Sequence, residues 1–226
     1  MNPTLLSIVI PVLNEAPSIG ASLACLQPLR EQGAEVIVVD GGSDDDSVLQ
    51  AQPCADVVMD APRGRARQMN VGAASAHGAI LLFLHADTQL PPGADGLIRK
   101  AIEAGGVWGR FDVRIVGQHP MLRVVAILMN WRSCLTGLAT GDQAMFVRRD
   151  VFERVGGFPD QLLMEDIELS QRLRRLARPV CITRQVATSG RRWETLGVWR
   201  TIFLMWRLRW RYWRGESAEH LAEAYR

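Results

Sequence analysis

A short apolar run that ends in an acid is the feature that most restricts the fold of this chain. Residues 80–84 read Ile-Leu-Leu-Phe-Leu, and His85, Ala86 and Asp87 follow at once. Five apolar residues are too few for a typical helix and suit a strand buried on both faces of a parallel sheet. Ligands bind beyond the carboxyl ends of such strands. Asp87 is therefore either a carboxylate that holds a divalent cation against phosphate oxygens or a cap on the next helix.

Strand and helix patterns alternate through the first hundred residues. Strands are predicted at 5–12, 35–40, 57–59 and 80–84, and helices at 18–26, 64–76 and 93–104. This spacing predicts βαβ units, right-handed crossovers and a mostly parallel sheet. Further along, the pattern predicts strands at 107–116 and 144–148, an apolar helix or loop at 121–135, and helices at 166–176 and 195–213, with a short helix after Gly215. We expect an α/β domain over 1–194 and a helical appendage over 195–226.

Composition narrows the class of protein. The 226 residues suffice for one large domain, and 48% hydrophobic with 22% charged residues is ordinary for a globular protein. No apolar run approaches the roughly 18 residues of a membrane span, and the apolar N-terminal segment reads as a strand rather than a signal peptide. Four widely spaced cysteines without a CxxC pair favour reduced thiols in a cytoplasmic protein over a zinc site.

Acidic residues also follow the first two predicted strands. Asn14 and Glu15 come after the first strand, and Asp40 ends the second and precedes Gly41. Because neighbouring parallel strands end at one edge of a sheet, both acids should face the same crevice. Asp40 can then accept hydrogen bonds from a base or ribose, and Gly41 permits close backbone approach. The alternative is an acidic turn that caps the next helix.

Three arginines, Arg63, Arg65 and Arg67, stand at the start of the helix predicted at 64–76. Cations at a helix N-terminus oppose the macrodipole, so this placement is locally unfavourable. A bound polyanion would relieve it, because arginine forks and free backbone N–H groups both suit phosphate. Arg65 and Arg67 are thus candidate phosphate ligands, with solvated surface arginines as the alternative.

Six short motifs follow one another along the chain. They are Ile10-Pro11-Val12-Leu13-Asn14-Glu15, Val38-Val39-Asp40-Gly41-Gly42-Ser43-Asp44-Asp45, His85-Ala86-Asp87, Gly141-Asp142-Gln143-Ala144-Met145-Phe146, Gly156-Gly157-Phe158 and Glu165-Asp166-Ile167-Glu168-Leu169. Each is weak alone, but in this order they resemble the family 2 glycosyltransferases of GT-A fold. The resemblance covers about residues 5–195.

The resemblance implies a fold and a nucleotide site. The fold would be GT-A-like, a Rossmann-like α/β arrangement with a mostly parallel sheet between helices. The donor would be a nucleotide-diphosphate sugar. Its nucleotide would be held by Glu15 and Asp40. Four further residues of the motifs would line the nucleotide site: Pro11, Asn14, Gly41 and Ala86.

The resemblance also implies a metal and a base. Mg²⁺ or Mn²⁺ would be held on the diphosphate by Asp87 and His85, although His85 stands where the usual motif has an acid and leaves the ligand set open. Asp166 would be the catalytic base. Three further residues, Gly141, Asp142 and Glu165, would line the acceptor and donor-sugar side. Without the resemblance, Glu165 and Asp166 read as acids favoured in the first turn of a helix.

The chemistry of transfer completes this interpretation. Negative charge accumulates on the leaving diphosphate, and a divalent cation with nearby arginines would stabilise it. Asp166 would take the proton from the acceptor hydroxyl. A single direct displacement predicts inversion at the anomeric centre. The acceptor is left open, with a lipid-linked acceptor among the alternatives.

The C-terminal helix is basic and aromatic. Trp199, Phe203, Trp206, Trp210 and Trp213 recur at spacings of 4, 3, 4 and 3, which places them in one stripe. Residues 191–214 carry seven Arg and one Glu. The stripe is either packed, against this domain or in a homodimer, or it lies on an anionic membrane surface. Since the rest of the chain is acidic, nucleic acid is not an expected partner.

Trp193 allows two interpretations. It ends the run Arg191-Arg192-Trp193, which weakly resembles the Gln-x-x-Arg-Trp element of processive polysaccharide synthases, with Ser189 in the place of Gln. Trp193 would stack on an acceptor sugar ring or belong to the core.

Two other functions compete with glycosyl transfer. A nucleotidyltransferase shares the sheet and the acidic cation site, but it normally has a Gly-rich basic loop after the first strand, where this chain has Pro11 to Glu15. The second alternative is a non-catalytic nucleotide-binding or membrane scaffold protein.

Overall fold

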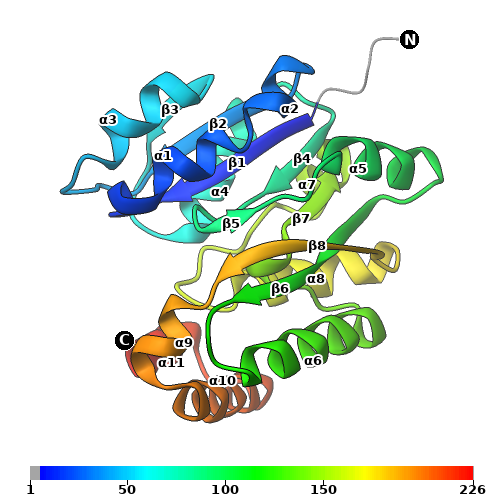
Figure 1. Ribbon diagram of the computed structural model, residues 1–226. Coiled ribbons are helices and arrows are strands. Elements are labelled where there is room, and N and C mark those ends of the chain that lie inside the picture. The colour runs from blue at the N-terminus through cyan, green and yellow to red at the C-terminus, as the bar shows by residue number, and fades with distance from the viewer. Residues whose placement is uncertain (1–5, 226) are drawn as a thin grey trace.

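Four parallel strands form the N-terminal half of the sheet (Figure 1). β1 (Leu6–Val12) pairs with β2 (Glu35–Asp40) on one side and β4 (Ile80–Phe83) on the other, and β3 (Val57–Asp60) follows β2. Val12 lies opposite Asp40, so β1 and β2 end at the same level. The computed structural model describes residues 6–225.

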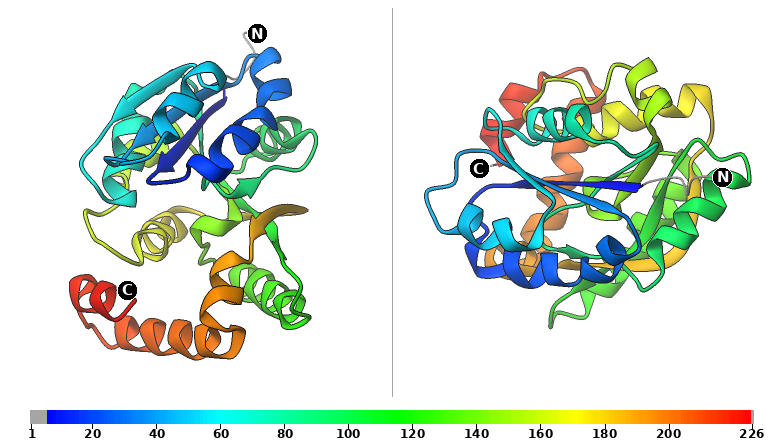
Figure 2. Two further views of the ribbon diagram at one scale, coloured as in Figure 1. Left: turned by 60° about the vertical axis from the view of Figure 1, so that its left-hand side comes forward. Right: turned by 90° about the horizontal axis from the view of Figure 1, so that it is seen from above.

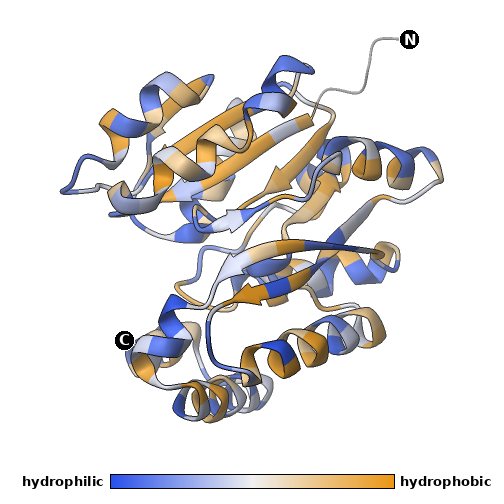
Figure 3. Ribbon diagram, viewed as in Figure 1, coloured by the Kyte–Doolittle hydropathy of each residue, from blue (hydrophilic) through white to orange (hydrophobic). Residues whose placement is uncertain are grey.

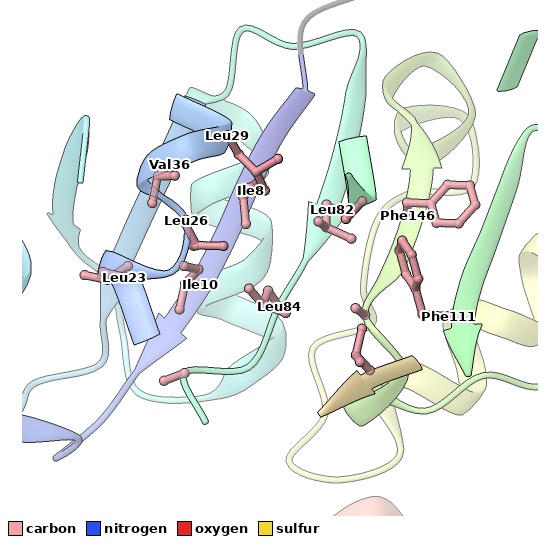
Figure 4. Packing of buried hydrophobic residues seen from close by; sticks show 14 of the residues in the cluster. Ile8, Ile10, Leu23, Leu26, Leu29, Val36, Leu82, Leu84, Phe111 and Phe146 are labelled. Carbon is pink, nitrogen blue, oxygen red and sulfur yellow. The ribbon is translucent and has the colours of Figure 1, made fainter. Parts of the chain in front are cut away.

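Both faces of these strands are buried. Ile8 and Ile10 of β1 belong to one apolar cluster with Leu23 of α1 (Ala16–Ala24), and Figure 4 shows the three close together. Val9, between the two isoleucines, belongs to a second cluster with Met69 of α4 (Arg65–Ser75). Helices therefore cover both faces of the sheet, as the view from above in Figure 2 shows. Figure 3 shows the apolar colour along β1, β2 and β4.

The other half of the sheet is mixed. β7 (Met145–Arg148) is antiparallel to β4 and to β6 (Trp108–Val116), β8 (Val180–Ser189) is parallel to β6, and β5 (Thr88–Gln89) closes the order β3-β2-β1-β4-β7-β6-β8-β5. The remaining elements of the α/β body are α2 (Gln27–Glu31), α3 (Ser47–Ala51), η1 (Gln52–Cys54), α5 (Ala94–Glu103), α6 (Met121–Thr136), η2 (Gly141–Gln143), α7 (Arg149–Arg154) and α8 (Glu165–Leu176).

Three helices end the chain. α9 (Arg191–Leu196), α10 (Val198–Trp213) and α11 (Ala218–Tyr225) lie at the lower end of the molecule in Figure 1. Leu208 of α10 and Leu221 of α11 form a third apolar cluster with Met164 and Ile167 at the start of α8. The appendage is therefore attached to the body next to the predicted base. Within residues 6–225, no helix is both long and apolar enough to cross a membrane.

The predicted fold class is confirmed, and several local predictions need correction. The helix predicted at 195–213 is interrupted at Gly197, whose φ of +85° breaks it into α9 and α10. The first helix begins at Ala16 because Pro17 is accepted in its first turn. β8 was not predicted, because its middle residues are exposed and polar and give no alternating pattern. Residues 121–135, predicted as helix or loop, are helical.

Candidate functional site

A buried glutamine joins the ends of β1 and β2. Gln68 of α4 donates from Nε2 to the carbonyl oxygens of Val12 and Val39, each at 2.8 Å. Gly41 packs on the same side chain, since a Cβ there would lie 3.0 Å from Gln68 atoms. Sequence reasoning missed Gln68, because a lone polar residue in a helix does not indicate which carbonyls it will meet.

Asp40 is built into the loop after β2. It is 3% exposed, and its Oδ2 accepts hydrogen bonds from the backbone N–H groups of Gly42 (2.8 Å) and Ser43 (2.9 Å). Ser43 Oγ accepts from the N–H of Asn14 at 2.9 Å, and Asn14 Oδ1 accepts from the N–H of Asp44 at 2.9 Å. The loops after β1 and β2 thus form one hydrogen-bonded unit, as their predicted common edge requires.

Glu15 connects this unit to the C-terminal helices. Its Oε2 accepts from Ser18 Oγ at 2.9 Å and lies 3.6 Å from Nη2 of Arg191 on α9. The two residues are far apart in the sequence, so this contact brings the start of α9 to the predicted nucleotide side.

A second unit forms around η2. His85 Nδ1 lies 3.3 Å from Asp142 Oδ1. Gly141, which precedes Asp142, has no room for a side chain, because a Cβ there would lie 2.3 Å from His85 Nε2. A capping box between Thr140 and Gln143 fixes this short helix. The structure therefore brings the predicted metal-side histidine against the predicted sugar-side residues.

Asp166 is attached to the same short helix. Its Oδ2 accepts the N–H of Gly141 at 2.9 Å, and its Oδ1 accepts the N–H of Ile167 at 2.7 Å. Neighbouring Glu165 is 6% exposed, and burial, followed by the charge of Asp166, raises its pKa. The two acids thus differ: Asp166 is hydrogen-bonded to the first residue of η2, whereas Glu165 is buried.

The ionisable groups around these acids shift one another's pKa. Burial acts to raise the pKa of Asp142, but the hydrogen bond and charge of His85, with the charges of Arg65 and Arg209, hold it below its usual range. The surrounding protein partly desolvates Arg65 and so acts to lower its pKa, yet the charges of Glu165, Asp142 and Asp166 raise it, and the side chain still has solvent-exposed surface. Asp142 keeps 45% of its side-chain surface accessible to solvent, so its carboxylate can still be reached by a ligand.

Two further arginines approach the site from α6 and α10, and the sequence did not single them out. Burial lowers the pKa of Arg209 on α10, although Asp166 and Asp142 oppose the shift. Burial and the like charge of Arg209 lower the pKa of Arg132 on α6 to about 10. Arg132 Nε and Nη2 are buried without a hydrogen-bond partner among the described residues. Both guanidinium groups can be named only from the fold, because they lie on helices that look merely apolar or aromatic.

Other predicted residues lie apart from these contacts. Arg67 forms an ion pair with Asp160 at 2.7 Å, so only Arg65 of the two candidate phosphate ligands faces the acids. Trp193 is half-buried and packs against the first apolar cluster. Pro11 is buried within β1, and Ala86 is buried after β4.

Residues with strained backbone conformations lie in the same loops. Within residues 6–225, the non-glycine residues with positive φ are Asn14 (55°), Ala144 (47°) and Met164 (64°). They precede Glu15, follow Asp142 by two residues and precede Glu165. Such conformations cost energy and concentrate at functional sites. The strain marks the loops that carry the predicted acids.

A metal would find few protein ligands here. Asp87 is half-buried, and its Oδ1 accepts from Thr88 Oγ1 at 3.4 Å. Across the described part of the chain, no three His, Cys, Asp or Glu side chains gather closely enough to hold an ion alone. Mg²⁺ is commonly held by one or two carboxylates together with substrate phosphates. Asp87 and the His85–Asp142 pair fit that second kind of site.

Known proteins resemble this chain in sequence. The chain is 28% identical to the probable glycosyltransferase YdaM of Bacillus subtilis over 93% of its own length, but it spans only 55% of that protein. It is also 28% identical to the uncharacterized glycosyltransferase Rv1514c of Mycobacterium tuberculosis, with coverage of 81% of this chain and 75% of that protein.

Solved structures agree on the architecture. S. aureus TarS 1-349 superposes with a TM-score of 0.64 at 15% identity, covering 82% of this chain and 60% of that chain. The mannosyltransferase PcManGT from Pyrobaculum calidifontis, in complex with GDP-Man and Mn²⁺, gives 0.60 at 21% identity, covering 83% and 57%. The family model described as glycosyl transferase family 2 matches residues 7–156. This match, over more than half of the chain, shows that the protein belongs to glycosyl transferase family 2.

Proposed function

We propose that this protein transfers a sugar, of the hexose type, from a nucleotide-diphosphate sugar to an acceptor hydroxyl with inversion. The observation that carries the proposal is the hydrogen bond from the Gly141 N–H to Asp166, because it ties the predicted base to the short helix that also carries Asp142, the partner of His85. Structural relatives support the donor class, since one is described with GDP-Man and Mn²⁺ and TarS is described with UDP-GlcNAc.

The loops after β1 and β2 would hold the nucleotide. Asp40 is held in one orientation by the N–H groups of Gly42 and Ser43, and Glu15, in the loop after β1, lies 3.6 Å from Arg191. A preorganised carboxylate suits a ribose or base better than a mobile one, because less ordering is needed on binding.

Asp87 and His85, with Asp142 beside them, are the residues that would hold Mg²⁺ or Mn²⁺. Such a cation would stabilise negative charge on the leaving diphosphate. Arg65 would supply further positive charge from the chain itself, since nearby acids keep it firmly protonated.

Asp166 would accept the proton of the acceptor hydroxyl. A carboxylate that receives two backbone N–H bonds is held in one orientation, which is what a general base needs. Arg132 on α6 and Arg209 on α10 both interact with the charge of Asp166, so the acceptor would bind between these two helices and the start of α8. The proposed location is the cytoplasm, with peripheral contact to the inner face of the cell membrane.

Replacement of Asp166 tests the proposal directly. Asp166→Asn should reduce turnover by about 10²–10⁴-fold, the usual contribution of a general base, while donor binding measured by calorimetry is retained. Glu168→Gln is the matched control, because Glu168 lies in the same helix and pairs with Arg172 at 3.0 Å. Turnover of Asp166→Asn near that of the control would refute the assignment. NMR of the product would contradict a single displacement if the donor configuration were retained.

The same assays separate the competing functions. A nucleotidyltransferase would release pyrophosphate from a nucleoside triphosphate, and a non-catalytic scaffold would bind the donor without consuming it. Release of a nucleoside diphosphate from the donor, dependent on Asp166, favours glycosyl transfer over both.

A further inference from the structure

α6 and α10 together carry most of the exposed large apolar side chains of the described chain. We name this set the α6–α10 face and define it by Val124, Ile127, Leu128, Trp131 and Leu135 of α6 and Trp199, Phe203, Trp206, Trp210 and Trp213 of α10. Their exposed fractions run from 42% at Val124 to 82% at Trp213. Both helices lie at the lower end of the molecule in Figure 1, away from β1 to β4. A monomeric protein rarely leaves this much apolar surface without a partner.

The helices expose these side chains because their opposite faces are occupied. α6 packs on the body through Leu122 and Ala126, and α10 packs through Leu208. The aromatic stripe on α10 is therefore not packed against this domain, which removes one of the three predicted arrangements. What remains is a second copy of the chain or a membrane.

The charges around the face distinguish these two partners. Neither α6 nor α10 contains Asp or Glu, and Arg123, Arg200, Arg207 and Arg214 are exposed beside the apolar side chains. A symmetric dimer through this face would bring the same arginines of two copies together without acids from either helix to pair with them. An anionic membrane supplies the complementary charge.

The aromatic composition favours the same partner. Five of the seven tryptophans of the chain lie on the α6–α10 face. Tryptophan prefers the headgroup level of a bilayer, and arginine is drawn to anionic lipid at that depth. We propose that the α6–α10 face is a docking surface for an anionic lipid membrane, on which the protein lies without crossing it.

Docking would also bring the membrane near Asp166. Leu208, which holds α10 to the start of α8, is next to Arg209, and the same apolar cluster contains Ile167 beside Asp166. A membrane under α6 and α10 would therefore lie close to the acceptor side. The docking itself does not depend on the proposed transfer reaction, so binding and activity can be tested separately.

Vesicle cosedimentation of the full chain tests the surface. The probes are phosphatidylcholine vesicles with and without a fraction of phosphatidylglycerol, at low and high salt. We expect binding to the anionic vesicles at low salt, with a blue shift of tryptophan emission, and weakening at high salt. Each arginine near such a surface contributes about fivefold in affinity, so binding to neutral vesicles should be at least tenfold weaker.

Two substitutions give the test its control. Trp206→Glu should lower affinity for anionic vesicles at least tenfold, because it places an acid at the centre of the face. Leu49→Glu changes a side chain that is 66% exposed on α3, outside the face, and should leave binding unchanged. Failure of the wild type to bind anionic vesicles at low salt would overturn the proposal. A dimer in solution that Trp206→Glu dissociates, without vesicle binding by either form, would also overturn it and assign the face to a second copy.

Discussion

The N-terminal and C-terminal halves of the molecule differ in two respects: how many buried polar atoms lack a hydrogen-bond partner, and how many large apolar side chains are exposed. Within the described chain, the buried side-chain atoms that lack a hydrogen-bond partner are Arg110 Nε, Arg132 Nε and Nη2, Ser133 Oγ and Arg192 Nε, all beyond residue 109. Exposed large apolar side chains follow the same division, since Leu49 is the one that precedes Val116. The N-terminal half is a self-sufficient scaffold. The C-terminal half carries groups that a bound molecule or surface would complete.

A large loss of activity is expected where the two halves meet. β4 pairs with β1 of the first half and β7 of the second, and Asp87 follows it. Asp87→Ala should lower Mn²⁺-dependent turnover by about 10²–10³-fold, because the charge on the leaving diphosphate loses its stabilising cation. Initial rates over a Mn²⁺ titration measure this effect. Asp150→Ala, at an exposed ion pair with Arg148, is the control, and equal rates in the two variants would remove Asp87 from the metal site.

The same division explains what the sequence could predict. The strand at 35–40 was predicted correctly, because strands buried on both faces appear as uninterrupted apolar runs. β8 was not predicted because its middle residues are exposed and polar, and the interruption at Gly197 was not predicted because a single glycine in a helical pattern does not by itself indicate a break. Asp142 and Asp166 were named through a resemblance. Arg132 and Arg209 were not named, because only the fold brings α6 and α10 to them.

A pair of glycines tests whether the first half is a close-packed scaffold. In α4, a Cβ on Gly72 would lie 2.5 Å from Val9 Cγ1 and 2.8 Å from Val39 Cγ2, so Gly72→Ala should cost about 1–3 kcal/mol of unfolding free energy. In α5, a Cβ on Gly96 would meet nothing within 4 Å, so Gly96→Ala should add about 0.4–1 kcal/mol. Urea unfolding measures both. Equal effects would show that the strands relax around the added methyl group.

Two arginines, one in each half, test whether the halves differ in the pairing of their polar groups. Arg30 in the first half pairs with Asp56 at 2.7 Å, so Arg30→Met should lower stability by about 0.2–1 kcal/mol. Arg132→Met removes a buried cation with unpaired nitrogens and should leave stability unchanged or raised. It should also raise the KM for the acceptor about tenfold, the value of one charged contact of about 1.4 kcal/mol. A loss of stability in Arg132→Met with an unchanged KM would mean that Arg132 is structural.

A small effect that depends on pH is expected from a hydrogen-bonded cluster around Glu35 in the first half. Glu35 of β2 accepts the N–H of His77 at 2.8 Å and the hydroxyl of Ser7, which itself accepts the N–H of Gly78 at 2.8 Å. Burial acts to raise the pKa of Glu35, but the hydrogen bonds from His77 and Ser7 outweigh it and lower the pKa below its ordinary value.

The pH dependence of stability follows from that direction. A carboxyl group with a lower pKa in the folded chain than in the unfolded chain binds fewer protons when folded. Its contribution is therefore complete above the unfolded pKa, about 4.3, and is lost as the pH falls through the lowered folded pKa. Glu35→Gln should cost about 1 kcal/mol at neutral pH and progressively less on acidification. Urea unfolding of both proteins at neutral and acidic pH measures the difference. A difference that stays constant across this range would mean that the cluster acts through shape rather than charge, and the first half would then hold together without its ionised groups.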